Sequence, residues 1–305
     1  MIPVLSAWRF TLRHSLRPQT LILFVVFMVS LLAGPHARAE KLRVVYPIPS
    51  SKQQNRVGHA FALMELALKK SGVDYELVQS QVGMVQARAL IEVELGRGVD
   101  IAWAMTNLSR EQRLRPIRIP VDKGVLGWRL LLIQERNAAQ FAKIRSLDQL
   151  KPLMAVQGHD WPDTDVLRSN GVKVQVDADF ANLFKILERG RVDFFPRSLQ
   201  EIWPEAERHA DGGLVVEQTL VVRYPAALYF FVNKKNTALA KALETGLERA
   251  IADGSYEKLF QQFYGDAIRR SKLATRKAIK LENPYLPPGM PLQRKELWFQ
   301  GAAAP

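Results

Sequence analysis

The sequence predicts an α/β fold in which strands and helices alternate in two successive units. Short apolar or alternating runs recur along the chain, and most are followed by helical stripes with apolar residues at i, i+3 and i+4. The 305 residues are 48% hydrophobic and 9% aromatic, which suffices for the core of one large domain or two of ordinary size. This composition excludes disordered and fibrous proteins.

The first unit is predicted after residue 40, and Pro47, Pro49, Gly72 and Gly96 end its elements. Its elements are a strand at Lys41–Tyr46, a helix from Val57 to Leu68, a strand at Val73–Val78, a helix at Gln86–Leu95 and a strand at Val99–Ala104. This order predicts a parallel sheet covered by helices.

The second unit repeats the alternation and is followed by a closing strand and two helices divided by Gly254. The predicted elements are strands at Leu126–Gln134, Leu153–Gln157, Val172–Val176, Val192–Phe195 and Ala227–Val232, and helices at Pro162–Asn170, Phe180–Leu187, Leu239–Ile251 and Tyr256–Phe263. Two similar corners support the division: Gly96-Arg97-Gly98-Val99-Asp100 and Gly190-Arg191-Val192-Asp193 each end a helix and open a buried strand.

Residues 1–39 have the features of a secretory signal peptide. Three arginines and no acidic residue precede the apolar run Leu21–Leu32, and Ala37-Arg38-Ala39 follows as a small-x-small cleavage site. The run is too short to span about 30 Å of hydrocarbon as a helix. We expect cleavage after Ala39, with an uncleaved anchor as the alternative.

The net charge of +13 makes nucleic acid or an anionic membrane a partner to consider. Cleavage would remove four arginines and leave a dispersed +9, without a basic helix carrying stacking aromatics, so no nucleic-acid partner is expected. Residues 271–305 are basic and Pro-rich, and we expect a solvated tail, with a membrane- or partner-docking arm as the alternative.

The absence of cysteine excludes disulfides, thiolate metal sites, cysteine nucleophiles and a lipidated cysteine. The chain also contains no His-Glu-x-x-His, Gly-x-Ser-x-Gly or P-loop motif. We therefore expect no catalytic residues, no metal and no cofactor.

The segment Tyr229–Asn236, followed by Asp253-Gly254-Ser255-Tyr256 and Phe263-Tyr264-Gly265, resembles the end of bacterial extracellular solute-binding proteins of family 3. These are polar-amino-acid-type receptors of ABC transporters. The similarity continues through Gly190–Asp193 and through the strand at 99–104 with Thr106 after it.

The resemblance implies a type II periplasmic-binding fold, with two α/β lobes, a hinge and an interlobe cleft. Residues 40–124 and 227–270 would form lobe 1 and residues 125–226 lobe 2, with hinge crossings near Lys123–Trp128 and Arg223–Ala227. It further implies a monomeric periplasmic protein that passes a small polar solute to an inner-membrane ABC permease or a sensor protein.

The sequence departs from the family pattern at two loops. Tyr46–Ser51 lacks the usual aromatic-Pro-Phe contact, and Pro196-Arg197-Ser198 stands where the family often has an aspartate for a ligand ammonium group. A standard α-amino acid is therefore not the clear expectation for the ligand.

In open α/β sheets the ligand lies beyond the carboxyl ends of the strands, so the residues after each strand are the candidates for binding. In lobe 1 these candidates are Tyr46, Trp103, Thr106, Asn107, Arg110 and Arg113. One of the two arginines could hold an anionic group bidentately, while the alternative is a solvated basic loop.

In lobe 2 the candidates are Gly158, His159, Asp160, Trp161, Asp163, Arg197 and Ser198. Gly158 and the helix start at Pro162 could cradle an anion, and Asp160 or Asp163 could instead bind an ammonium group. The alternatives are that the aspartates only cap the helix and that Trp161 belongs to the core.

Two rival functions remain for this fold. A dehydratase-like lyase would need a carboxylate or histidine with a shifted pKa in the cleft, for which His159 and Glu111 are the candidates. A ligand-reading sensor module for a membrane kinase is the other.

Overall fold

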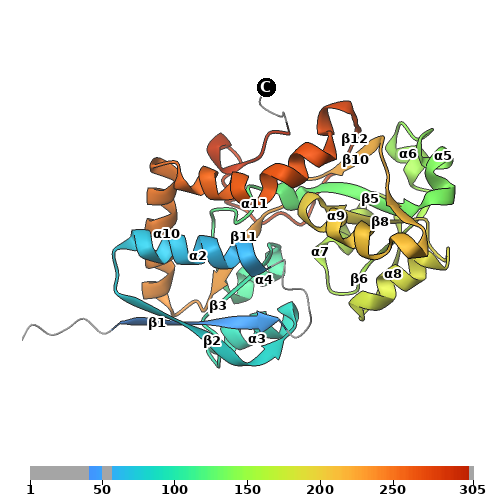
Figure 1. Ribbon diagram of the computed structural model, residues 1–305. Coiled ribbons are helices and arrows are strands. Elements are labelled where there is room, and N and C mark those ends of the chain that lie inside the picture. The colour runs from blue at the N-terminus through green and yellow to red at the C-terminus, as the bar shows by residue number, and fades with distance from the viewer. Residues whose placement is uncertain (1–40, 50–56, 302–305) are drawn as a thin grey trace, which may run out of the picture. The chain divides into compact units, whose positions relative to one another are not determined.

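The computed structural model describes residues 41–49 and 57–301 (Figure 1). The predicted signal peptide and Ser50–Ser51 lie outside the described residues. Within the described part, no helix is both long and apolar enough to cross a membrane.

The strands and helices alternate along most of the chain. The strands are β1 Leu42–Pro49, β2 Tyr75–Met84, β3 Ile101–Met105, β4 Arg115–Ile117, β5 Trp128–Gln134, β6 Met154–Gly158, β7 Lys173–Asp177, β8 Phe194–Ser198, β9 Leu214–Val216, β10 Leu220–Arg223, β11 Leu228–Val232 and β12 Lys277–Lys280. The helices are α2 Val57–Ser71, α3 Gln86–Leu95, α4 Leu108–Arg113, α5 Ala138–Phe141, α6 Leu147–Leu150, α7 Pro162–Ser169, α8 Phe180–Glu188, α9 Leu199–Arg208, α10 Thr237–Ala252 and α11 Ser255–Ser271.

The strands β1, β2, β3, β4 and β11 form two separate sheets, which together are called the first sheet system. This arrangement differs from the predicted parallel sheet. β1 and β2 form a parallel pair, but β11 lies between β3 and β4 and is antiparallel to both. A helical crossover enforces parallel pairing, whereas β11 returns to this system through the short connection 224–227 and enters from the opposite direction. The predicted parallel pairing is therefore confirmed for β1 and β2 but is wrong for β3, which pairs with β11 in a separate sheet.

β1 continues through Pro47 and Pro49, which were expected to end it. Among residues 41–49 and 57–301, β2 is the only sheet neighbour of β1, and the register of this pair shifts between Tyr46 and Ile48. Edge strands and bulges are the sheet positions that tolerate the missing N–H of proline, so the strand survives both residues.

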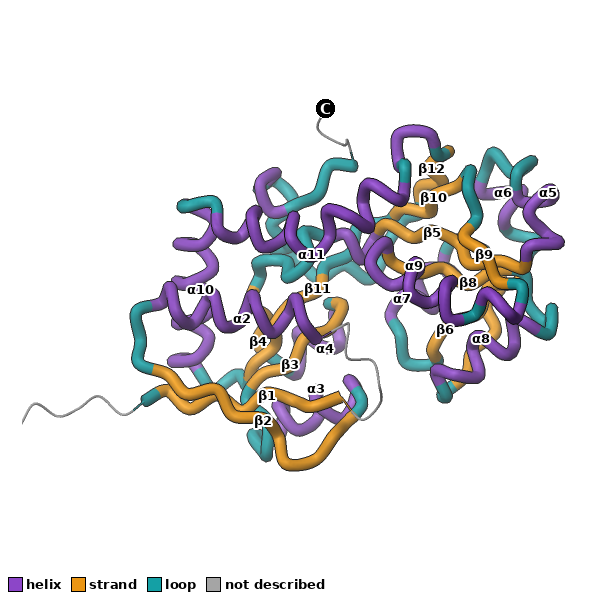
Figure 2. Tube along the Cα trace, in the orientation of Figure 1, coloured by secondary structure: helices purple, strands orange, loops and turns teal. Residues whose placement is uncertain are grey.

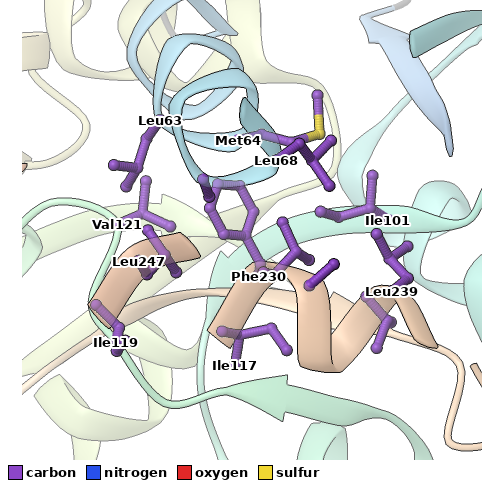
Figure 3. Packing of buried hydrophobic residues seen from close by; sticks show 14 of the residues in the cluster. Leu63, Met64, Leu68, Ile101, Ile117, Ile119, Val121, Phe230, Leu239 and Leu247 are labelled. Carbon is purple, nitrogen blue, oxygen red and sulfur yellow. The ribbon is translucent and has the colours of Figure 1, made fainter. Parts of the chain in front are cut away.

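The strand β11 is buried on both faces, which explains its continuous apolar sequence. Phe230 and Val232 pack against α2 and α10, where Leu63, Met64 and Leu247 contribute, as Figure 3 shows for Phe230 and the leucine and methionine side chains. On the other face, Tyr229 and Phe231 pack with Ala89, Leu90 and Val93 of α3.

The second sheet system has the order β12-β10-β5-β8-β6-β7, with β9 also paired to β5. Figure 2 labels all of these strands except β7. β6 is parallel to β7 and β8, whereas β5 is antiparallel to β8, β9 and β10. Pro196-Arg197-Ser198 lies inside β8 rather than after it, so the predicted strand end at Phe195 is wrong.

The two predicted corners form the same hydrogen bonds. The amide of Asp100 donates to the carbonyl of Val45 at 2.8 Å, and the carboxylate of Asp100 accepts from the amide of Val45 at 2.8 Å. Asp193 forms the same pair with Met154, at 2.8 and 2.7 Å. Each aspartate thus fixes the start of a strand in its own sheet system, which confirms the equivalence of the corners.

The C-terminal segment (residues 272–301) is packed, so the expectation of a solvated tail is wrong. Ile279 and Leu281 are buried in the second sheet system, where β12 pairs with β10. Leu297 is fully buried in the core of the first system, beside α2 and α10. Apolar residues spaced among the basic ones give the segment a buried side, which the charge pattern concealed.

Residues 118–127 and residues 224–227 connect the two sheet systems, and the C-terminal segment contacts both of these connections. The amide of Tyr224 donates to the carbonyl of Gly127 at 3.1 Å, so the two connections run side by side. Asn283 donates to the carbonyl of Pro225 at 2.8 Å, and the amide of Phe299 donates to that of Lys123 at 2.7 Å.

Candidate functional site

A cavity of about 130 Å³ is lined by residues of both sheet systems. One side is formed by β3, β11 and the N-terminal parts of α2 and α3, and the other by β5, α7, β8 and α9. A cavity needs roughly 10–15 Å³ of this kind of volume to hold one water molecule. This cavity therefore has room for a small organic molecule.

Arg129 of β5 is the centre of a buried polar network in the cavity wall formed by β5, α7, β8 and α9. Its guanidinium pairs with Asp163 of α7, its Nε donates to the Tyr224 hydroxyl at 3.1 Å, and its Nη1 lies 3.6 Å from Glu201 of α9. Burial alone lowers the pKa of Arg129, but the charge of Asp163, with Tyr224 and Glu201, outweighs burial and raises that pKa. Arg129 is therefore fixed and permanently charged.

Arg197 of β8 forms a second, adjoining network. It is 1% exposed, donates to both carboxylate oxygens of Glu205 at 2.6 and 2.8 Å, and lies 3.2 Å from Glu201. Its guanidinium also lies over the rings of Phe195 and Trp161, at 4.6 and 5.2 Å from their centroids. These contacts occupy the guanidinium of Arg197. Arg197 is therefore a fixed part of the cavity wall rather than a cation free to bind a ligand.

The charges of this wall are close to balanced. Arg129 and Arg197 supply two positive charges, and Asp163, Glu201 and Glu205 supply three negative ones. Because each guanidinium already has a carboxylate partner, an anionic ligand gains little from either one.

His59 and Asp122 also line the cavity and are almost fully buried. Burial lowers the pKa of His59 to about 4, so its ring is neutral at pH 7. Burial raises the pKa of Asp122 to about 6, although the amides of Leu126 and Gly124 donate to its carboxylate at 2.7 and 3.0 Å.

Trp103 and Trp161 provide aromatic surface on opposite sides of the cavity. Trp161 is stacked near Phe195, with ring centroids 6.2 Å apart and an interplanar angle of 20°. A Cβ at Gly158 would lie 2.5 Å from the Trp161 ring, so only glycine allows the indole to cover the end of β6.

The structure brings five of the residues proposed from the sequence into the cavity wall, namely Trp103, Trp161, Asp163, Arg197 and Ser198. The other candidates lie outside its lining. Tyr46 packs against Phe61 at a centroid distance of 5.0 Å, Thr106 donates to Glu111 at 2.7 Å, and Asn107 caps α4. Gly158 supports Trp161 from beneath, and His159 and Asp160 are exposed.

The two candidate arginines of the first system have different surroundings. Arg113 is exposed and forms an ion pair with Glu94 at 2.7 Å. Arg110 is 7% exposed and donates to the carbonyl of Met105 at 2.6 Å. Burial lowers the pKa of Arg110, and the charges of Asp160 and Asp163 only partly offset that effect.

Sequence reasoning missed His59, Asp122, Arg129, Glu201 and Tyr224. Arg129 gave one signal, because it is the charged residue inside the apolar run Leu126–Gln134. Its partners Asp163 and Tyr224 are 34 and 95 positions away, so the network itself could not be read from the sequence.

No family model and no curated protein matches this sequence. Solved structures do match it. An ancestral arginine-binding protein bound to arginine has a TM-score of 0.53 at 20% identity, covering 74% of this chain and 98% of its own. A periplasmic His/Glu/Gln/Arg/opine family-binding protein from Silicibacter pomeroyi, in complex with lysine, has a TM-score of 0.54 at 11% identity, covering 73% and 97%.

A third match is an ancestral amino-acid-binding protein described as a precursor of cyclohexadienyl dehydratase. Its TM-score is 0.50 at 18% identity, and the alignment covers 73% of this chain and 95% of that one. At these identities the likeness establishes architecture alone. The chain therefore has the two-lobed α/β fold of periplasmic binding proteins.

Proposed function

We propose that this protein is a periplasmic substrate-binding protein, not an enzyme, that captures a small polar solute for an inner-membrane ABC permease or a sensor protein. The observation that carries the proposal is the cavity lined by both sheet systems. A ligand that contacts both systems binds their closed arrangement more tightly than an open one and so shifts the population toward closure.

The two sheet systems would serve as the lobes, with residues 40–124 and 227–270 in lobe 1 and residues 125–226 in lobe 2. The connections near Lys123–Trp128 and Arg223–Ala227 would be the hinges. The predicted signal peptide would export the chain, which would act as a monomer.

The ligand would carry both polar and apolar surface. Arg110 is the better candidate for an anionic group near the cavity, although it lies outside the lining, because Arg113 is already paired with Glu94 at the surface. Asp163 in the lining would favour a cationic group, with Asp160 outside it, and Trp103 and Trp161 would contact the apolar body.

A thermal-shift experiment tests this proposal. The probes are L-arginine, L-lysine, L-glutamate, putrescine, succinate and glycine betaine, of which the first two are ligands of the matched structures. A probe at 100 times its Kd stabilises the folded protein by about 2.7 kcal/mol, which raises the melting temperature by several degrees.

A blocked variant ties the shift to the cavity. Gln200→Trp places an indole at the lining of the cavity, while Gln261→Trp makes the same change on an exposed face of α11. We expect at least one probe to shift the wild type and Gln261→Trp but not Gln200→Trp. Absence of any shift in the wild type, or equal shifts in all three proteins, would contradict the proposal.

One observation favours a lyase as a second candidate. The cavity contains a carboxylate and a histidine with shifted pKa values, Asp122 and His59, although not the two residues suggested by the sequence. Conversion of prephenate by the purified protein, lost in Asp122→Asn, would establish this activity. Prephenate that is bound but recovered unchanged would exclude that reaction.

A further inference from the structure

His59 of α2 is a buried polar side chain of the cavity wall that has no hydrogen-bond partner among the described residues. It is 2% exposed, and neither ring nitrogen is bonded to any residue that the structure describes. Buried polar side-chain atoms are paired in the large majority of cases, so an unpaired imidazole beside a cavity requires an explanation.

Packing does not explain why this residue is a histidine. Its ring meets the edges or faces of Phe263 and Tyr264, with centroid distances of 5.1 and 4.9 Å. A phenyl ring could make the same contacts without burying two unpaired nitrogens.

The neutral state of the ring limits what can satisfy it. With a pKa of about 4, the imidazole offers one donor and one acceptor at pH 7, whichever nitrogen carries the proton. Asp122, Asp163 and Glu201 line the same cavity, and Arg129 and Arg197 offset two of these three negative charges. A carboxylate placed against His59 would add to the remaining negative charge, whereas a donor group would not.

We propose that His59 is a ligand-contact residue of this cavity and that the ligand presents to it a group with a proton to donate, such as an ammonium, guanidinium, amide or hydroxyl group. This inference rests on the proposed function. His59 would offer the ligand a neutral hydrogen-bonding group from α2, in addition to the charged candidates Arg110 and Asp163.

Calorimetric titration of the wild type and three variants with the same six probes tests the inference. His59→Phe removes both nitrogens and keeps the ring, so we expect a melting temperature equal to or above that of the wild type and an affinity at least about tenfold lower. His59→Gln keeps a donor and an acceptor and should retain more affinity than His59→Phe. His209→Gln is the control, because His209 pairs with Glu188 at 2.7 Å outside the cavity lining and should leave affinity unchanged.

The outcomes separate this inference from the function on which it rests. If a probe binds the wild type and His59→Phe equally well, His59 contacts only protein or water, and the inference is overturned while the proposed function stands. A tenfold loss confined to succinate would contradict the donor class. If none of the probes binds the wild type, both the function and the inference fail.

Discussion

Among single residues, His59 and Asp122 give the folding free energy opposite dependences on pH. His59 titrates near 6.5 when unfolded and near 4 when folded, so its stabilising contribution is complete above pH 6.5 and is lost as the pH falls toward 4. Asp122 titrates near 3.8 when unfolded and near 6 when folded, so its contribution is present below pH 3.8 and is lost as the pH rises through 6.

The variant His59→Phe should therefore lack the part of the decrease in unfolding free energy at acid pH that comes from His59. Between pH 7 and pH 4, a shift from 6.5 to about 4 corresponds to about 3 kcal/mol of unfolding free energy in the wild type. Urea unfolding at both pH values, for wild type and variant, measures the difference. Asp122→Asn is the control of opposite sign, and it should gain stability relative to wild type as the pH rises. An identical pH dependence in wild type and His59→Phe would show that His59 is not protonated differently on unfolding.

Single residues also show where the site could be predicted. Trp103 and Trp161 were candidates because they lie within or just after strands, and both line the cavity. His59 occupies a position of the apolar stripe of α2, where a histidine gives no sign of facing a cavity. Only the packing of α11 against α2 reveals its position.

Among the helices and strands, α2 and α10 pack closely at a glycine. Gly246 of α10 lies against the backbone of α2, and a Cβ at this position would be 1.7 Å from the carbonyl oxygen of Ala67. The absence of a side chain is thus what lets the two helices approach.

Gly246→Ala should destabilise the protein by about 3 kcal/mol or more, because the helices must separate. Gly58→Ala is the matched control in α2, where the new Cβ would make an ordinary contact of 3.4 Å with Phe263. The control should be neutral or stabilise by up to about 1 kcal/mol through helix propensity. Chemical denaturation of both variants gives these values, and equal stabilities for the two would refute the close approach.

Local elements were predicted better than their pairing. The helix Gln86–Leu95 has the predicted bounds, because Gly96 takes a left-handed conformation with φ of 65° and ends it. The pairing of β3 with β11 joins segments more than a hundred residues apart, and nothing local specifies it. The direction of β11 therefore had to come from the structure.

In the whole molecule, the C-terminal segment links the two sheet systems in addition to the two connections. It begins as β12 in the second system and ends with Leu297 in the core of the first. Arg294 also donates to both carboxylate oxygens of Glu248 of α10, at 2.6 and 2.9 Å. The segment is thus part of the fold, and the charge pattern alone could not show this.

Leu297→Ala should cost about 2–5 kcal/mol of unfolding free energy, as for other fully buried leucines. Leu292→Ala, in the same segment but 48% exposed, should cost less than about 1 kcal/mol. Guanidinium unfolding of the two variants checks this difference. Equal and small effects would mean that the segment does not pack in solution as it does in the structure.

Tryptophan fluorescence is the measurement that best tests whether the cavity binds a small solute between the two sheet systems. The wild type, Trp103→Phe, Trp161→Phe and Trp203→Phe are titrated with the probe that gives the largest thermal shift. Trp103 and Trp161 line the cavity, whereas Trp203 of α9 lies under Arg270 outside the lining. We predict a saturable fluorescence change that is reduced in Trp103→Phe and in Trp161→Phe and is unaltered in Trp203→Phe. A change that persists in full without Trp103 and without Trp161 would place the ligand elsewhere and contradict binding in this cavity.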